Sequence, residues 1–313
     1  MKRVGASRAI VVPAALRPGA RIAVVAPGSR ARPRPTREGL RILRRWGYEP
    51  VPAPHLFARD GDLAGDDASR AEDLVWALTT DDVDAVWAAR GGWGAARLLD
   101  RLPAARVRRR APLVVGFSDV TALQMWLLGQ GLASLYAPLV GELAEKTRYL
   151  GADLRAALSD PAGAKTIRVR REQVLKRGRA KGRLVPACLS VLVSLAGTRW
   201  QPDLRGAILV LEDVGEAPYR IDRMLWQLSA AGVTRGLAGL AFGQFTGCRP
   251  AAGRPSRRLS QILRAHAAIL DVPAVSGVPV GHGPRTRVLP VGVHASLDAS
   301  AGLLRVGGPA AGR

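Results

Sequence analysis

The sequence has few residues of the kinds that build disulfide-bonded, metal-binding or membrane-anchored proteins. It contains only two cysteines, Cys188 and Cys248, which form neither a disulfide framework nor a metal-ligand spacing. Its longest nearly uncharged apolar stretch, residues 184–197, is shorter than the roughly 20 residues that a membrane-spanning helix needs. The apolar stretch near the N-terminus is short and contains Pro13, unlike a signal peptide. We therefore expect a cytoplasmic protein with reduced thiols and no membrane partner.

Lysine and aromatic residues are also scarce, although the chain is strongly basic. The formal net charge is +22, yet only five of the 47 basic residues are lysine, and aromatic residues make up 5% of the chain. Such an arginine bias, together with abundant Ala, Gly and Pro, is as typical of a GC-rich genome as of a selected surface. No interleaving of aromatic and basic residues offers a platform for stacked bases. Nucleic-acid binding is therefore not expected as the main function, while attraction to an acidic surface or an anionic substrate stays open.

The first half of the chain alternates short apolar strands with helical patterns. Hydrophobic residues make up 48% of the 313 residues, which is enough for a substantial core in one or two domains. The expected strands are 21–26, 49–52, 85–89 and 112–116, and the expected helices are 36–46, 68–79, 95–100 and the segment that follows residue 120. This alternation predicts an α/β fold with a parallel sheet and helices on both faces. Ligands bind such sheets at the carboxyl ends of the strands.

The second half carries most of the excess positive charge. Residues 146–313 contain 26 basic and 10 acidic side chains, against 21 and 15 in residues 1–145. We expect an N-terminal domain over 1–145, a basic linker over 146–183 with an edge strand near 167–170, and a C-terminal domain over 184–313. In the C-terminal domain we expect a helix-like run at 184–196, strands at 207–211, 239–242 and 274–280, and helices at 219–230 and 259–270. The basic stretch is typical of a solvated surface, and a functional basic patch is the alternative.

The segment from Pro112 to Leu123 is the most informative part of the chain. An apolar strand breaks at Gly116, and an apolar helix pattern begins just after Ser118. That order places Ser118 on a sharp strand-to-helix turn, with the amide of Asp119 directed at the same space from a helix N-terminus. Val120 breaks the usual G-x-S-x-G pattern, and Ser and Asp are ordinary helix caps. The residues alone thus leave a nucleophile and a helix cap as alternatives.

Two other loops are expected at the same edge of the sheet, at residues 27–29 and 90–94. The glycines of the second loop let the backbone approach a ligand closely and expose amide donors, although a plain tight turn explains them equally well. A dinucleotide site is not favoured, because no G-x-G-x-x-G opens a helix after the first strand.

An acid and a base candidate follow apolar strands in the second half. Glu212 comes at the end of an apolar run, and His282 is flanked by glycines after another. An exposed carboxylate and a structural histidine are the alternatives when each residue is taken alone. Together with Ser118 they stand in the nucleophile–acid–base order of α/β hydrolases. Their chemistry fits: an imidazole takes the serine proton, and a carboxylate holds the imidazole in the right tautomer.

Collinear motifs spread over residues 21–295 carry a more specific signal. They are VVAPGS at 24–29, RGGWGA at 90–95, GFSDVTAL at 116–123, LED with YRIDRML at 211–213 and 219–225, and GHGP with LPVG at 281–284 and 289–292. These motifs resemble those of the serine L,D-carboxypeptidase family, which includes muramoyltetrapeptide carboxypeptidases and microcin-C immunity peptidases. The resemblance implies a flavodoxin-like N-terminal domain with a parallel sheet and a smaller β-rich α/β C-terminal domain. It also implies a homodimer and no metal or organic cofactor.

The same resemblance implies a role for each candidate residue. Ser118 would be the nucleophile, His282 the general base and Glu212 the orienting carboxylate, in a triad assembled across the domain interface. The amide of Asp119 and one from Gly91 or Gly92 would form the oxyanion hole.

The implied activity is release of the C-terminal D-alanine from murein tetrapeptides in peptidoglycan recycling, through an acyl-enzyme. Two alternatives are a related enzyme acting on a peptidyl-nucleotide antibiotic and a catalytically weakened binding protein for an anionic ligand. The chain departs from the family where Pro186-Ala187-Cys188 replaces the usual Gly-Gly-Asn and where Ala137 replaces a glycine before Pro138.

Overall fold

The computed structural model describes residues 9–253 and 255–307 and divides into two compact units. The N-terminal unit ends at Pro161, and the C-terminal unit begins at Ala162. This division lies inside the 146–183 stretch that the sequence suggested as a linker. That stretch contains most of one helix, two complete strands and the first half of a third, because its basic side chains alternate with apolar ones that pack onto each unit.

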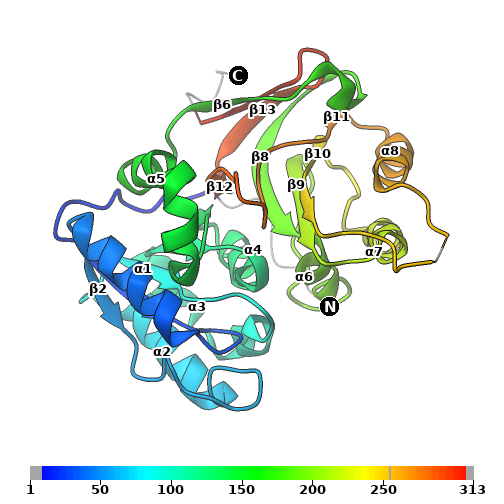
Figure 1. Ribbon diagram of the computed structural model, residues 1–313. Coiled ribbons are helices and arrows are strands. Elements are labelled where there is room, and N and C mark those ends of the chain that lie inside the picture. The colour runs from blue at the N-terminus through cyan, green and yellow to red at the C-terminus, as the bar shows by residue number, and fades with distance from the viewer. Residues whose placement is uncertain (1–8, 254, 308–313) are drawn as a thin grey trace. The chain divides into compact units, whose positions relative to one another are not determined.

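The N-terminal unit is built on a parallel sheet (Figure 1). Its strands are β1 (Arg21–Val25), β2 (Glu49–Pro52), β3 (Ala85–Ala88), β4 (Leu113–Gly116) and β5 (Ser134–Tyr136), in the order β2-β1-β3-β4-β5. This is the flavodoxin-like order, as the family resemblance implied. The central strands β3 and β4 are buried along their whole length, which explains why they read as continuous apolar runs.

Helices cover both faces of this sheet. They are α1 (Pro33–Arg45), α2 (Asp67–Thr79), α3 (Ala104–Arg110), α4 (Thr121–Gly129) and α5 (Leu143–Ser159), with short 3₁₀ helices at Ala95–Arg101, Ser118–Val120 and Val140–Glu142. Local chemistry explains two of the starts: α1 begins on a proline, and the Asp66 carboxylate accepts the Ser69 N–H at 2.7 Å before α2. Helix α1 packs on α5, whereas α2 packs on α3, so the two sets lie on opposite faces.

The C-terminal unit contains an eight-stranded mixed sheet with the order β6-β14-β13-β8-β9-β10-β11-β7. The strands are β6 (Lys165–Arg168), β7 (Val174–Lys176), β8 (Arg179–Cys188), β9 (Ala207–Val214), β10 (Gly239–Thr246), β11 (Ala274–Val275), β13 (His294–Asp298) and β14 (Leu303–Val306). The four strands from β8 to β11 run parallel, and antiparallel strands extend them on each side. The expected edge strand near 167–170 is confirmed as β6, which ends the sheet.

Three helices pack beside the parallel strands of this sheet (Figure 1). They are α6 (Leu189–Ser194), α7 (Pro218–Ala230) and α8 (Leu259–Leu270), and a short strand, β12 (Leu289–Val291), precedes β13. The expected helix-like run at 184–196 is wrong over its first half, because β8 continues through Cys188. Residues 184–188 are buried and pair with β9, and a short apolar run of that kind does not reveal its period.

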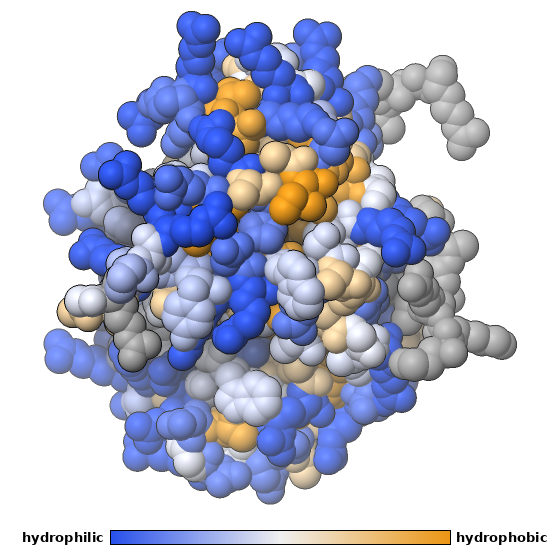
Figure 2. Space-filling model, turned by 90° about the vertical axis from the view of Figure 1, so that its right-hand side faces the viewer, coloured by the Kyte–Doolittle hydropathy of each residue, from blue (hydrophilic) through white to orange (hydrophobic). Residues whose placement is uncertain are grey.

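Hydrophilic side chains dominate the face on which α7 and α8 lie (Figure 2). Apolar groups lie between them. The exposed large hydrophobic side chains of these two helices are Tyr219, Trp226 and Ile269. None of the helices formed by residues 9–253 and 255–307 has the length and apolar character that crossing a membrane requires.

Candidate active site

Ser118 occupies a strained position between β4 and α4. Strand β4 ends at Gly116, Phe117 is extended, and the φ angle of Ser118 is +61°, in the left-handed region. A residue with a Cβ pays roughly 1–2 kcal/mol for that conformation. The predicted strand-to-helix turn is therefore present, with the geometry that exposes a nucleophile in an elbow. A simple helix cap needs no such strain.

Gly91 brings the loop after β3 against this serine. A Cβ added at Gly91 would lie 2.8 Å from both Cβ and Oγ of Ser118 and 3.4 Å from the Asp119 nitrogen. No side chain fits there, so the glycine serves close backbone approach and not merely a turn. The Gly91 backbone and the Asp119 nitrogen thus both lie close to the Ser118 side chain.

Replacing Gly91 with alanine should lower kcat by about 10²-fold or more, the usual loss when one oxyanion donor is misplaced. The added methyl group must displace either Ser118 or the loop, since its nearest neighbour is a backbone-anchored Cβ. The matched control is Gly151→Ala in α5, at a glycine without a positive φ, where the nearest atoms to an added Cβ lie at ordinary contact distances of 3.7 and 3.9 Å. Steady-state kinetics and circular dichroism of both variants test this expectation. Full activity of Gly91→Ala would contradict the close approach.

The side chain of Asp119 holds the glycine loop in place. Its carboxylate is buried, with 3% of the residue exposed, and Oδ2 accepts the Ala95 N–H at 2.9 Å. The buried guanidinium of Arg70 donates to the carbonyls of Pro27 and Gly94, so it ties the loop after β1 to the same structure. The sequence suggested the Asp119 amide as an oxyanion donor or the residue as a helix cap, but neither the Asp119–Ala95 contact nor the role of Arg70. Nothing in the neighbouring sequence indicates that these two charged side chains are buried.

Burial raises the pKa of Asp119 to about 6, against 3.8 for an ordinary aspartate, although amide donors partly oppose the shift. The folded state thus holds this proton more tightly than the unfolded state, and the resulting stability is complete below pH 4 and lost as pH rises through about 6. Asp119→Asn removes this titration. The native chain therefore loses about 2–3 kcal/mol of stability between pH 4 and 7 that the variant does not lose. The difference in free energy of unfolding, variant minus native, should increase by that amount over this range. Urea denaturation across that range measures the difference, and a constant difference would refute the shift.

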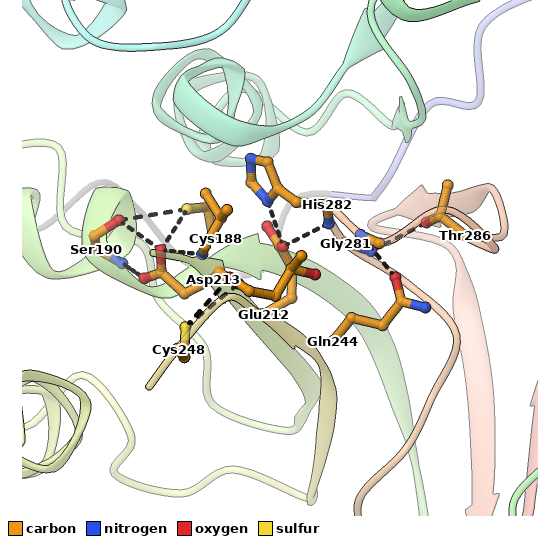
Figure 3. Close-up of polar contacts among 12 residues, drawn as sticks. Cys188, Ser190, Glu212, Asp213, Gln244, Cys248, Gly281, His282 and Thr286 are labelled. Atoms are coloured by element: carbon orange, nitrogen blue, oxygen red, sulfur yellow. Dashed lines mark hydrogen bonds and ion pairs between the residues drawn. The ribbon is translucent and has the colours of Figure 1, made fainter. Parts of the chain in front are cut away.

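Glu212 and His282 form a close pair in the C-terminal unit (Figure 3). The Glu212 side chain is completely buried, and its Oε2 lies 2.7 Å from His282 Nδ1 and accepts the His282 backbone N–H at 3.2 Å. With Nδ1 donating to the carboxylate, the neutral imidazole carries its lone pair on Nε2. This is the tautomer that a general base requires.

The sequence suggested that Glu212 and His282 each lie where a strand ends, and neither does. Strand β9 continues past Glu212 to Val214, because the segment up to Asp213 is buried between β8 and β10. Strand β11 stops at Val275, and His282 lies in the loop that follows. Val278 and Val280 are buried and make backbone hydrogen bonds to Phe242 and Gln244 without forming a regular strand.

The loop around His282 is fixed by hydrogen bonds to its backbone. The Gly281 N–H donates to Thr286 Oγ1, and the Gly283 N–H donates to Gln244 Oε1, both at 3.0 Å (Figure 3). Gly281 has a φ of +126°, and a Cβ there would collide with the Glu212 carboxylate. The sequence suggested that the flanking glycines leave the His282 ring accessible. In addition, Gly281 allows the backbone to pass close to the Glu212 carboxylate.

A second polar cluster lies beside Glu212 (Figure 3). Asp213 Oδ2 accepts the Ser190 N–H at 2.8 Å, and Cys188 Sγ lies 3.8 Å from Asp213 Oδ1. Burial, with the charges of Glu212 and Asp213, raises the pKa of the Cys188 thiol well above its usual value. The cysteine that departs from the family pattern is therefore a protonated core residue and not a second nucleophile.

The candidate residues thus fall into two groups. The N-terminal unit brings Ser118 together with Asp119 and Gly91, and the C-terminal unit brings Glu212 together with His282. Within residues 9–253 and 255–307, no three His, Cys, Asp or Glu side chains are grouped so that they could hold a metal ion.

Comparison with known proteins identifies the family. The model of the LD-carboxypeptidase N-terminal domain matches residues 22–137, and that of the LD-carboxypeptidase C-terminal domain matches residues 181–297. A putative carboxypeptidase of Streptomyces coelicolor is 40% identical over 312 residues, covering 97% of this chain and 98% of the relative. The chain belongs to the LD-carboxypeptidase family. The two units correspond to the two domains that define this family.

Relatives named as murein peptide carboxypeptidases also match most of this chain. The murein tetrapeptide carboxypeptidase of Pseudomonas aeruginosa is 32% identical, covering 89% of this chain and 93% of its own length. The crystal structure of a muramoyltetrapeptide carboxypeptidase from Oxalobacter formigenes is 30% identical, has a TM-score of 0.81, and covers 92% of this chain and 99% of its own. The microcin C7 self-immunity protein MccF is 20% identical at a TM-score of 0.84, covering 96% of this chain and 99% of its own, which supports the shared fold. A hydrolytic carboxypeptidase function follows from the family.

Proposed function

We propose that this protein is a serine-type L,D-carboxypeptidase that releases the C-terminal D-alanine from murein tetrapeptides in peptidoglycan recycling. The observation that carries the proposal is the left-handed conformation of Ser118, a strained elbow packed against a glycine loop. The Glu212–His282 pair supplies the remaining members of a serine triad. The substrate is that of the murein tetrapeptide carboxypeptidase to which the chain is similar.

In the proposed acylation step, Ser118 Oγ attacks the carbonyl carbon of the last peptide bond while His282 Nε2 takes the hydroxyl proton. Glu212 keeps the ring in its Nδ1–H tautomer and stabilises the imidazolium that forms. The carbonyl oxygen becomes an oxyanion, which accepts hydrogen bonds from the amides of Asp119 and of Gly91 or Gly92. When the intermediate collapses, the C–N bond breaks and the D-alanine amine leaves with the proton from His282.

The acyl-enzyme is then hydrolysed by the same groups. His282 removes a proton from water, the resulting hydroxide attacks the Ser118 ester, and the oxyanion again uses the two backbone amides. Collapse returns the proton to Ser118 Oγ and releases the shortened peptide as a carboxylate. No other reactant than water is needed.

Incubation of the purified protein with a muropeptide digest tests the substrate. The expected result in mass spectrometry is conversion of tetrapeptides to tripeptides with the loss of one alanine, while pentapeptides with a D-alanyl-D-alanine end stay intact. Unchanged tetrapeptides would refute the proposal. An aminoacyl-sulfamoyl adenylate assayed in parallel tests the alternative amide substrate, and faster turnover of that compound would replace the murein assignment.

We also propose that the protein acts as a homodimer in the cytoplasm, as the family resemblance implies. The two cysteines are free and buried, which fits a reducing compartment. Sedimentation velocity of the full chain measures the assembly state, and a monomer at assay concentration would contradict the homodimer.

A further inference from the structure

A cavity of about 560 Å³ opens in the N-terminal unit where the loops after β1 and β3 meet. Strand β2 lies on one side of β1 and β3 lies on the other, so the order of the strands reverses at this point of the sheet. Open α/β sheets bind ligands in the crevice at such a point. The residues used below line it: Arg30, Arg32, Arg59, Asp62, Arg90 and Trp93.

The lining of this cavity is strongly cationic. Four arginines face one acidic lining residue, Asp62, which leaves a net charge of +3. Among the described residues, no carboxylate forms an ion pair with any of the four arginines. Burial, with repulsion from Arg32 and Arg30, lowers the pKa of the Arg90 guanidinium. An anion inside the cavity would relieve that repulsion.

Local geometry favours an anion at the same place. Arg90 Nη1 donates to the Arg30 carbonyl at 2.9 Å, which orients one guanidinium against the neighbouring loop. Helix α1 starts at Pro33, on the cavity wall, with no acidic residue in its first turn, so its positive dipole end is not neutralised locally. Planar guanidinium groups match carboxylate and phosphate oxygens in pairs, which a lysine cannot do.

The cavity adjoins the candidate nucleophile. Gly92 lines the cavity, and the preceding Gly91 is in close contact with Ser118. Trp93, which is 55% exposed, adds an apolar surface to the same wall. One ligand can therefore reach both the serine and the arginines.

We propose that this arginine cavity binds a multiply charged anionic group, a phosphate or a set of clustered carboxylates, on the ligand whose amide bond Ser118 attacks. A single carboxylate would neutralise only part of the charge, so the group carries at least two negative charges. The link to the attacked amide rests on the proposed function, whereas binding of the anion does not.

Direct binding measurements test binding of the anion separately from its link to the attacked amide. Inorganic pyrophosphate and the tricarboxylate tricarballylate are titrated calorimetrically into the full chain and into three variants at fixed, low ionic strength. Arg59→Gln and Arg90→Gln each remove a cavity arginine. Either substitution should weaken binding by about tenfold, which corresponds to the loss of one weak hydrogen bond between charged groups. Arg44→Gln is the matched control, because it removes the same charge from the exposed far end of α1 and should leave binding unchanged.

The proposal is overturned if neither probe binds the native chain at about 10 mM, or if both cavity variants bind as tightly as the control. Tighter pyrophosphate binding identifies a phosphate-bearing ligand, and tighter tricarballylate binding identifies an acidic peptide. Arginine-dependent binding without any peptidase activity would leave this inference standing and refute the proposed function. With active enzyme, Arg59→Gln should raise KM for the acidic substrate about tenfold and change kcat by less than about twofold.

Discussion

Substitution of Ser118 by alanine should lower kcat by about 10⁵- to 10⁶-fold, the loss typical of a nucleophile in a serine triad. The variant keeps a Cβ and therefore the strained φ of +61°, so the turn and the rest of the fold should be unchanged. Release of D-alanine from a murein tetrapeptide measures the rate, and circular dichroism reports the fold. Activity within about tenfold of the native chain would exclude Ser118 as nucleophile.

Ser118→Gly is the matched variant, because glycine adopts a positive φ without strain. It should be as inactive as Ser118→Ala, yet more stable than Ser118→Ala by about 1 kcal/mol from the relief of backbone strain. Thermal denaturation of the two variants measures this difference. Equal stability would show that the turn stores no strain, independently of the catalytic result.

Substitution of Glu212 by glutamine should lower kcat by about 10⁴-fold while preserving the shape of the site. The Glu212 carboxylate accepts hydrogen bonds from both Nδ1 and the backbone N–H of His282 through one oxygen. A glutamine that presents its NH₂ group to Nδ1 favours the opposite tautomer, in which Nε2 carries the proton and is no longer a base. The pH profile of kcat/KM, together with the chemical shifts of the His282 ring, tests this explanation.

Asp213→Asn is the control for that variant. Asp213 is the next residue of β9, so its side chain points to the other face of the sheet, where it accepts hydrogen bonds from Ser190. Burial raises the pKa of Asp213, and removal of its charge should alter stability and leave kcat within about threefold of the native value. Equal losses in Glu212→Gln and Asp213→Asn would indicate that general disruption of β9, and not a tautomer, lowers the rate.

Most regular elements of the N-terminal unit could be predicted from the sequence. The expected strand at 49–52 matches β2, and the expected helix at 68–79 differs from α2 by one residue. Polar side chains mark these boundaries locally, for example Asp66 before α2. The C-terminal unit was less predictable at 184–188, where a short buried apolar run carries no period that distinguishes a helix from a strand, and at 276–280, where only Val278 and Val280 are buried and the segment is a packed loop.

The sequence by itself determined the alternation of strands and helices, the turn that carries Ser118, and the family motifs. Each of these is encoded by residues within a few positions of one another. Tertiary structure alone decided the left-handed φ of Ser118, the contact between Glu212 and His282 across 70 positions, and the meeting of Arg30, Arg59 and Arg90 around one cavity. These features depend on long-range packing, which sets the burial and electrostatic environment of a side chain and has no local signature in the chain.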